Sequence, residues 1–368
     1  MKKKSLYNIK EHRLALCCLL CMLGMSAANA SAYSLFDGNF RFDWVASNAL
    51  FPTAIADPFA ASSSLKVLQV KEGTPRYLYK EKSDGSFTKE NLYGEGSYTD
   101  KNLYLQLKTG VNIGFFRVSL FDNKIQSELT LQGGLNSVFQ GFGGADNLGY
   151  DGIFFIGANA RLFDMVTFRA GLQHYSGHYG DETIENAYDH DDTLLADGSL
   201  VDYCRDNDVA IGMSLTPLKP LRLYATASLP KESSWISPHI VVPSWVRKPS
   251  SGVLYGYNDY DQSYKDWIMQ GGIEYAIPIP TVGSLTLAAD MKFYQDGQIE
   301  DMFTSSPSYD ADNPWETDYT VGGALVFPSG PTGLSARLEV FYHDGRFPLL
   351  NFFYQRTRYV SIGFSVAE

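Results

Sequence analysis

Residues 334–343 read Leu-Ser-Ala-Arg-Leu-Glu-Val-Phe-Tyr-His, and this stretch decides the fold class. Alternate side chains of a β-strand point to opposite faces. Arg337, Glu339 and His343 therefore share one face, and the opposite face holds apolar or aromatic side chains: Leu334, Ala336, Leu338, Val340 and Tyr342. A strand with full charges in the middle of one face is typical of a barrel that has lipid outside and water inside.

The same alternation recurs over 221–229, 285–293 and 359–366. These segments approach the length of about ten residues with which a tilted strand crosses a bilayer. A soluble β-sandwich also alternates, but its strands typically have only about 5–6 residues. The pattern therefore favours an antiparallel transmembrane barrel over a soluble sandwich.

The number of strands follows from the segments that fit this pattern. Candidates lie at 103–120, 124–140, 150–162, 164–178, 206–216, 220–230, 267–279, 284–295, 317–329, 334–344 and 352–367. One more strand in the N-terminal region would give about twelve, and bacterial barrels favour even numbers. Short and long connections alternate along the chain, as periplasmic turns and outer loops do. We therefore expect an all-β antiparallel transmembrane β-barrel in the cell outer membrane.

The first thirty residues predict export. A basic start is followed by an apolar run from Leu14 to Met25 and by Ala28-Asn29-Ala30, which is the pattern of a secretory signal peptide. We expect residues 31–100 to be an N-terminal lead-in or plug with a possible first strand, and residues 101–368 to be the barrel. An exported barrel implies outer-membrane lipid and the barrel-assembly machinery as partners.

Charge and cysteine content exclude two other classes of protein. The formal net charge is −11, and it becomes −15 after cleavage at Ala30. Nucleic-acid binding needs clustered Lys and Arg, so we expect no nucleic-acid partner. Cys204 is the one cysteine beyond residue 30, so the exported chain forms no internal disulfide.

The densest polar cluster lies at 174–182, which reads His-Tyr-Ser-Gly-His-Tyr-Gly-Asp-Glu. In the strand that leads to it, Phe168 and Leu172 lie on the apolar face. The same parity places His174, Ser176 and His178 on that face, which looks towards lipid in a barrel. Polar side chains are costly there, so they suggest a function.

Residues two apart on a strand are about 6–7 Å apart, so His174 can act as general base for the Ser176 hydroxyl. Parity on the next strand puts Asn207 on the same face, where it can orient His174. Asp181 and Glu182 are alternative orienters and, with His178, candidate binding residues. The hypothesis is a lipid-facing serine hydrolase that acts on outer-leaflet acyl esters.

Three alternatives remain open at this point. The cluster can be a structural strand end, in which Gly177 and Gly180 allow a bulge or turn. It can belong to a metal site, because the acidic loop 181–202 offers oxygen ligands that suit Ca²⁺, although EF-hand spacing is absent. The chain can also be a non-enzymatic barrel, either a narrow channel or a structural surface protein. Enzymatic activity, cofactor and metal are therefore left undecided.

The pair His174 and Ser176 resembles the His-x-Ser pair that outer-membrane phospholipase A and the barrel-form lipid A deacylases carry on the barrel exterior. The resemblance implies Ser176 as nucleophile, His174 as base and Asn207 as orienter, but the Asn-Gly that follows the pair in some of those enzymes is absent. More broadly, the chain resembles domain-of-unknown-function family 1207, whose signature is His-x-Ser-Ser-His-x-Gly-Asp-Glu. Gly177 replaces the second Ser of that signature, and that family implies an exported barrel without a known activity.

Overall fold

The chain forms a closed β-barrel of twelve antiparallel strands in a computed structural model. The structure describes residues 33–35, 39–46, 48–81, 87–92, 101–141, 147–188, 199–200, 204–229, 267–295, 312, 315–328 and 334–367. The predicted signal peptide at 1–30 lies outside these residues and stays a prediction.

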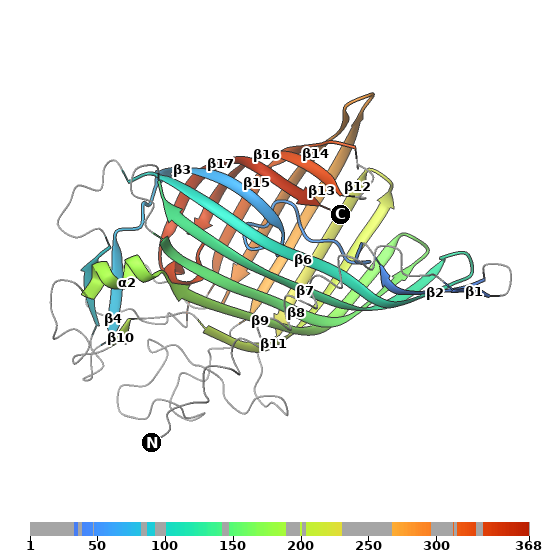
Figure 1. Ribbon diagram of the computed structural model, residues 1–368, viewed down its shortest axis with the longest axis horizontal. Coiled ribbons are helices and arrows are strands. Elements are labelled where there is room, and N and C mark those ends of the chain that lie inside the picture. The colour runs from blue at the N-terminus through green and yellow to red at the C-terminus, as the bar shows by residue number, and fades with distance from the viewer. Residues whose placement is uncertain are drawn as a thin grey trace, which may run out of the picture.

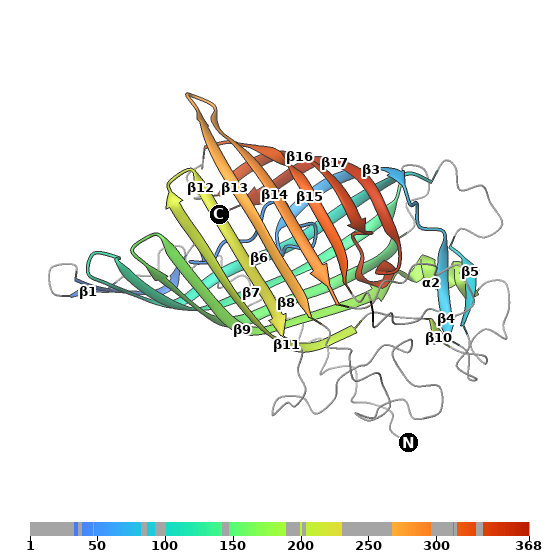
Figure 2. The same ribbon diagram turned by 180° about the vertical axis from the view of Figure 1, so that it is seen from behind.

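The wall consists of strands that follow one another in chain order (Figures 1 and 2). They are β3 (Ser63–Glu72), β6 (Leu103–Leu120), β7 (Ile125–Gln140), β8 (Asn147–Leu162), β9 (Val166–Tyr179), β11 (Cys204–Leu218), β12 (Leu221–Leu229), β13 (Ile268–Ile279), β14 (Gly283–Tyr294), β15 (Glu316–Val326), β16 (Ser335–Arg346) and β17 (Arg356–Ala367). The barrel closes because β3 pairs with β17 on one side and with the first half of β6 on the other. This closure confirms the predicted fold class and excludes a two-sheet sandwich.

The strand that the sequence did not locate is β3, so the wall begins before residue 101. The eleven other wall strands overlap the eleven predicted segments. No helix in the described part of the chain is both long and apolar enough to span a membrane.

The two faces of the wall differ as the alternation predicts. On β7, Glu128 and Gln132 are buried inside, whereas Leu129 and Leu131 are exposed outside. Large apolar side chains continue this exposed outer surface around the barrel, among them Ile156, Phe168, Ile211, Leu287, Val340 and Phe364. An apolar outer wall around a polar interior is the arrangement that a bilayer requires of a barrel.

The two ends of the barrel also differ. Short connections at 121–124, 163–165, 219–220 and 280–282 lie at one end. At the other end lie helix α2 (Asp181–Tyr188) and a small sheet of β4 (Tyr77–Glu81), β5 (Phe87–Asn91) and β10 (Ser199–Leu200) (Figure 1). The hairpin of β1 (Tyr33–Leu35) and β2 (Phe40–Ala46) extends the short-turn end, where β2 pairs with the second half of β6. By the usual asymmetry of such barrels, the end with α2 faces outward.

Residues 48–62, here called the plug segment, lie inside the barrel between β2 and β3. Leu50, Phe51 and Phe59 are each at most 4% exposed. The segment has no regular secondary structure, so its backbone groups need partners from the wall. Glu128 accepts a hydrogen bond from the Leu50 N–H at 2.6 Å, and Glu274 accepts one from the Ile55 N–H at 2.9 Å. Polar wall residues thus hold this irregular segment in the lumen.

The connection from β16 to β17, residues 347–355, forms a cap at the outward end. It contains the 3₁₀ helix η4 (Leu350–Phe352). Phe347 and Phe352 are fully buried in a cluster with apolar residues of β3, β6, β7, β8, β9 and β17. Asp151 of β8 accepts a hydrogen bond from the Leu350 N–H at 3.0 Å. The cap therefore packs against one side of the barrel mouth.

Candidate functional site

The polar cluster predicted from the sequence lies near the outward end of β9. His174 and Ser176 are half-buried and His178 is exposed, while the intervening Gly177 and the preceding Gln173 are buried. His174, Ser176 and His178 therefore occupy the same side of the strand as Phe168, which is 44% exposed on the outer wall. Three polar side chains follow one another on a surface that is otherwise largely apolar.

Ser176 lies opposite Gly152 of β8 in the strand register. A Cβ atom at Gly152 would lie only 2.8 Å from the Ser176 hydroxyl oxygen and 3.0 Å from the Phe154 ring. The absence of a side chain at Gly152 thus makes room for the hydroxyl beside the Phe154 ring. On the other side of β9, the partner of Ser176 in the register is Cys204 of β11.

The two histidines each contact an aromatic ring of β8. The His178 ring stacks on Tyr150 with centroids 4.8 Å apart, and the His174 ring lies 6.3 Å from that of Phe154. Within the described residues, no hydrogen bond joins the His174 imidazole to Ser176, and none joins either imidazole to loop backbone. The outer face therefore holds the His174 imidazole and the Ser176 hydroxyl on successive outward positions, without a hydrogen bond between them.

The β-bulge in β11 lies beside His174. The register runs from Arg205 opposite Tyr175 to Asp208 opposite Gln173, so Asp206 and Asn207 share the place opposite His174. The backbone of Asn207 thus lies next to that of His174; its side chain lies outside the described part of the chain. Parity with Val209 predicts Asn207 on the same face as His174, and its role as orienter stays a prediction.

Asp181 and Glu182 lie in the first turn of α2, and both are exposed. No hydrogen bond or ion pair joins them to His174 or His178 among the residues that the structure describes. Negative charges at a helix N-terminus are favourable because they interact with the helix dipole. The structure thus places them at the outward end of the barrel, separate from the His174 and Ser176 side chains.

The structure explains the glycine at position 177 by close packing, and not by the bulge or turn that the sequence allowed. β9 continues through Gly177 to Tyr179, and Gly177 pairs regularly with Asp151. A Cβ atom there would lie 2.6 Å from the side-chain oxygen of Asn351 in the cap. Gly177 therefore allows the cap to approach the inner face. The strand is not broken there, so the extended spacing of His174 and His178, about 13 Å, is too long for a shared metal ion.

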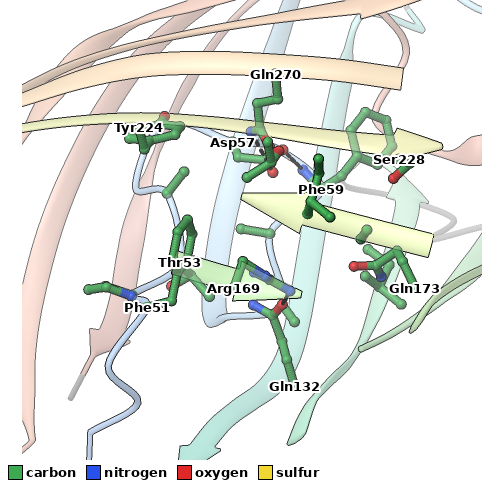
Figure 3. A pocket seen from close by; sticks show the side chains of 18 of the residues that line it. Phe51, Thr53, Asp57, Phe59, Gln132, Arg169, Gln173, Tyr224, Ser228 and Gln270 are labelled. Carbon is green, nitrogen blue, oxygen red and sulfur yellow. Dashed lines mark hydrogen bonds between the residues drawn. The ribbon is translucent and has the colours of Figure 1, made fainter. Parts of the chain in front are cut away.

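The lumen contains a second candidate site, which the sequence analysis missed. A small cavity of about 70 Å³ lies between the plug segment and strands β7, β8, β9, β11, β12 and β13. Figure 3 shows Phe51, Asp57 and Phe59 of the plug segment among Arg169, Tyr224 and Gln270 of the wall, with Asp57 directly beside Gln270. No local pattern identifies the cavity, because its lining comes from distant parts of the chain.

Ion pairs fix the plug segment around this cavity. Lys292 donates to Asp57 at 2.7 Å, and both side chains are nearly buried. Arg222 donates to the carbonyl oxygen of Pro52 at 2.7 Å while it pairs with Glu274 at 3.0 Å. Gln270 donates to Asp57 at 3.1 Å, and Tyr224 donates to Asp290 at 2.5 Å. The charged inner faces predicted from the sequence thus hold the plug.

The described residues contain no group of three or more His, Cys, Asp and Glu side chains that could hold a metal ion. Most of the acidic loop 181–202 lies outside the described residues. The calcium alternative therefore stays a prediction.

No family model matches the chain, and no curated protein matches it. Among solved structures, it is similar to the Salmonella typhi outer membrane phospholipase (OMPLA) dimer with bound calcium, with 10% identity, a TM-score of 0.46, and coverage of 84% of this chain and 91% of that one. It is also similar to the NanC porin (12%, TM-score 0.35, coverage 83% and 100%) and to the Pseudomonas putida toluene transporter TodX (12%, 0.33, 84% and 89%). Similarity this low carries no functional information, and membership of domain-of-unknown-function family 1207 is not confirmed.

The molecule is an outer-membrane β-barrel. The closed wall satisfies the backbone hydrogen bonds of its strands, and its outer surface is apolar. Short turns at one end and long connections at the other complete the architecture of such barrels.

Proposed function

We propose that this outer-membrane barrel hydrolyses acyl esters of outer-leaflet lipids at Ser176, with His174 as the general base. The observation that carries the proposal is the row of polar side chains on the outer face of β9, near the outward end of the barrel. A side chain on that face meets lipid, so a nucleophile there has direct access to lipid esters. Outer-membrane lipid is therefore the proposed substrate. The barrel-assembly machinery is the proposed partner for insertion of the barrel.

The chemistry needs a proton acceptor for the hydroxyl and room for the ester. His174 can reach Ser176 from its place two residues earlier on the strand, and a catalytic hydrogen bond often forms only when substrate is bound. Gly152 leaves space beside the hydroxyl. Asn207, on the bulge opposite His174, is the proposed orienter of the imidazole.

The test is acyl-ester hydrolysis by folded protein in detergent and in lipid vesicles, with and without Ca²⁺. We expect Ser176→Ala and His174→Ala each to lower the rate by a factor of about 10²–10⁴, since each removes one half of the nucleophile–base pair. The matched control is Ser137→Ala, because Ser137 lies on β7, is half-buried, and has Leu135 instead of a histidine two residues earlier. We expect this control to keep the wild-type rate.

Activity that survives in both variants, or is absent from the wild type, would overturn the proposal. Absence would favour the second candidate, a non-enzymatic surface barrel. The observation in favour of that candidate is the stacking of His178 on Tyr150, which can brace the outward end of β8 against β9. In that case we expect Asn207→Ala to fold like the wild type.

A further inference from the structure

The lumenal cavity contains one cation without a carboxylate partner among the described residues. Three charged side chains line it: Asp57, Arg169 and Arg222. Lys292 neutralises Asp57, and Glu274 neutralises Arg222. No carboxylate pairs with Arg169 in the part of the chain that the structure describes. The Arg169 guanidinium is therefore the charged group of the lining that is left to pair with a bound anion.

The surroundings of Arg169, which is half-buried, are unusual for a cation. Its guanidinium carbon lies 3.7 Å from the centroid of the Phe155 ring and 5.1 Å from that of Phe51. Among the described residues, its side chain makes one hydrogen bond, to the Gln132 side-chain oxygen, and this bond is long at 3.4 Å. Aromatic faces stabilise a cation, but they leave most of its N–H donors unused. The donors that remain are available to an anion in the cavity.

We propose that the lumen binds a small monocarboxylate whose carboxylate pairs with Arg169 and whose apolar body lies against the plug segment. A guanidinium presents a planar pair of donors that matches a carboxylate. Phe51 and Phe59 of the plug segment, together with Ile153 of β8, give the cavity an apolar part. A divalent anion such as phosphate fits less well, because Glu274 already occupies the second arginine of the lining.

This site is separate from the outer-wall cluster, although β9 supplies both. Arg169 and Gln173 face the lumen, whereas His174 and Ser176 face outward. The inference therefore goes beyond the proposed hydrolase, and we expect Ser176→Ala to bind the carboxylate as the wild type does. Failure of one proposal leaves the other standing.

The test is calorimetric titration of the folded full chain with benzoate, using benzamide as the uncharged analogue of the same shape. We expect saturable benzoate binding and at least tenfold weaker benzamide binding. Arg169→Gln should weaken benzoate binding at least tenfold, and Arg169→Lys should weaken it less, because Lys keeps the charge but loses the planar donor pair. The control Arg41→Gln removes a positive charge from the half-exposed Arg41–Asp43 pair, which lies outside the cavity lining, and should bind benzoate unchanged.

Equal binding of benzoate and benzamide, or full retention of benzoate binding in Arg169→Gln, would overturn the proposal. Displacement of benzoate by chloride at similar concentrations would also overturn it, because the site would then accept any inorganic anion. If Arg169→Gln fails to fold, the wild type still tests the proposal, because its binding of benzoate can be compared with its binding of benzamide and of chloride.

Discussion

At the scale of single residues, odd and even positions of one strand, β9, lie in two different environments, the lumen and the outer wall. On β9, Arg169 and Gln173 contribute to the lumen, and His174 and Ser176 contribute to the outer wall. A shift of the register by one residue would exchange these sets and place a charged guanidinium in lipid. The pairing of β9 with β8, regular over its whole length, therefore positions both candidate sites.

Gly177 is the residue at which the inner face comes closest to the cap. We expect Gly177→Ala to lower the free energy of unfolding by about 1–3 kcal/mol, because its methyl group would overlap the buried Asn351. The control is Gly271→Ala on β13, where a new Cβ would have its nearest contact at an ordinary 3.6 Å. Urea unfolding in lipid vesicles measures both, and equal midpoints for the two variants would contradict the proposed packing role of Gly177.

At the scale of elements, the plug segment depends on the wall more than on itself. It has no strand or helix, and its buried backbone groups bond to side chains of Glu128, Arg222 and Glu274. The wall in turn needs the plug segment, because the buried Lys292 of β14 pairs with the carboxylate of Asp57 in that segment. Wall and plug therefore stabilise each other.

The buried pair Asp57–Lys292 allows a quantitative test of this dependence. We expect Lys292→Met to cost about 3–5 kcal/mol of unfolding free energy, because it leaves a buried carboxylate without its cation. The double variant with Asp57→Asn should recover part of the loss, since it removes the orphaned charge. Arg41→Gln, which breaks the half-exposed pair with Asp43, should cost at most about 1 kcal/mol. A loss for Lys292→Met as small as that of Arg41→Gln would show that the plug is held by other contacts.

At the scale of the whole molecule, the barrel is filled. The plug segment occupies the lumen, and the cap packs against one side of the outward mouth. The charged inner faces predicted from the sequence thus serve mainly to bind the chain's own plug. The cavity beside the plug is one part of the described interior that offers space to a solute.

Ion conductance across a planar bilayer tests this description. We expect replacement of residues 50–60 by a Gly-Ser linker of equal length to raise the single-barrel conductance well above that of the wild type. The reason is that the linker lacks the buried rings of Phe51 and Phe59 that fill the lumen. Ser137→Ala, on the outer face, should conduct like the wild type. An unchanged conductance after plug replacement would mean that the cap alone closes the barrel.

Alternation along the chain was enough to predict eleven of the twelve wall strands, their approximate number and the outward face of β9. Alternation with period two is a local property of neighbouring residues. The closure of the wall by β3, the filling of the lumen by the plug segment and the room that Gly177 leaves for the cap depend on the folded barrel. Asp57 and Lys292 are 235 positions apart, and no local pattern links them. Contacts of this kind form only once the barrel encloses a volume, so the lumenal cavity and the unpaired Arg169 could not be predicted from the sequence.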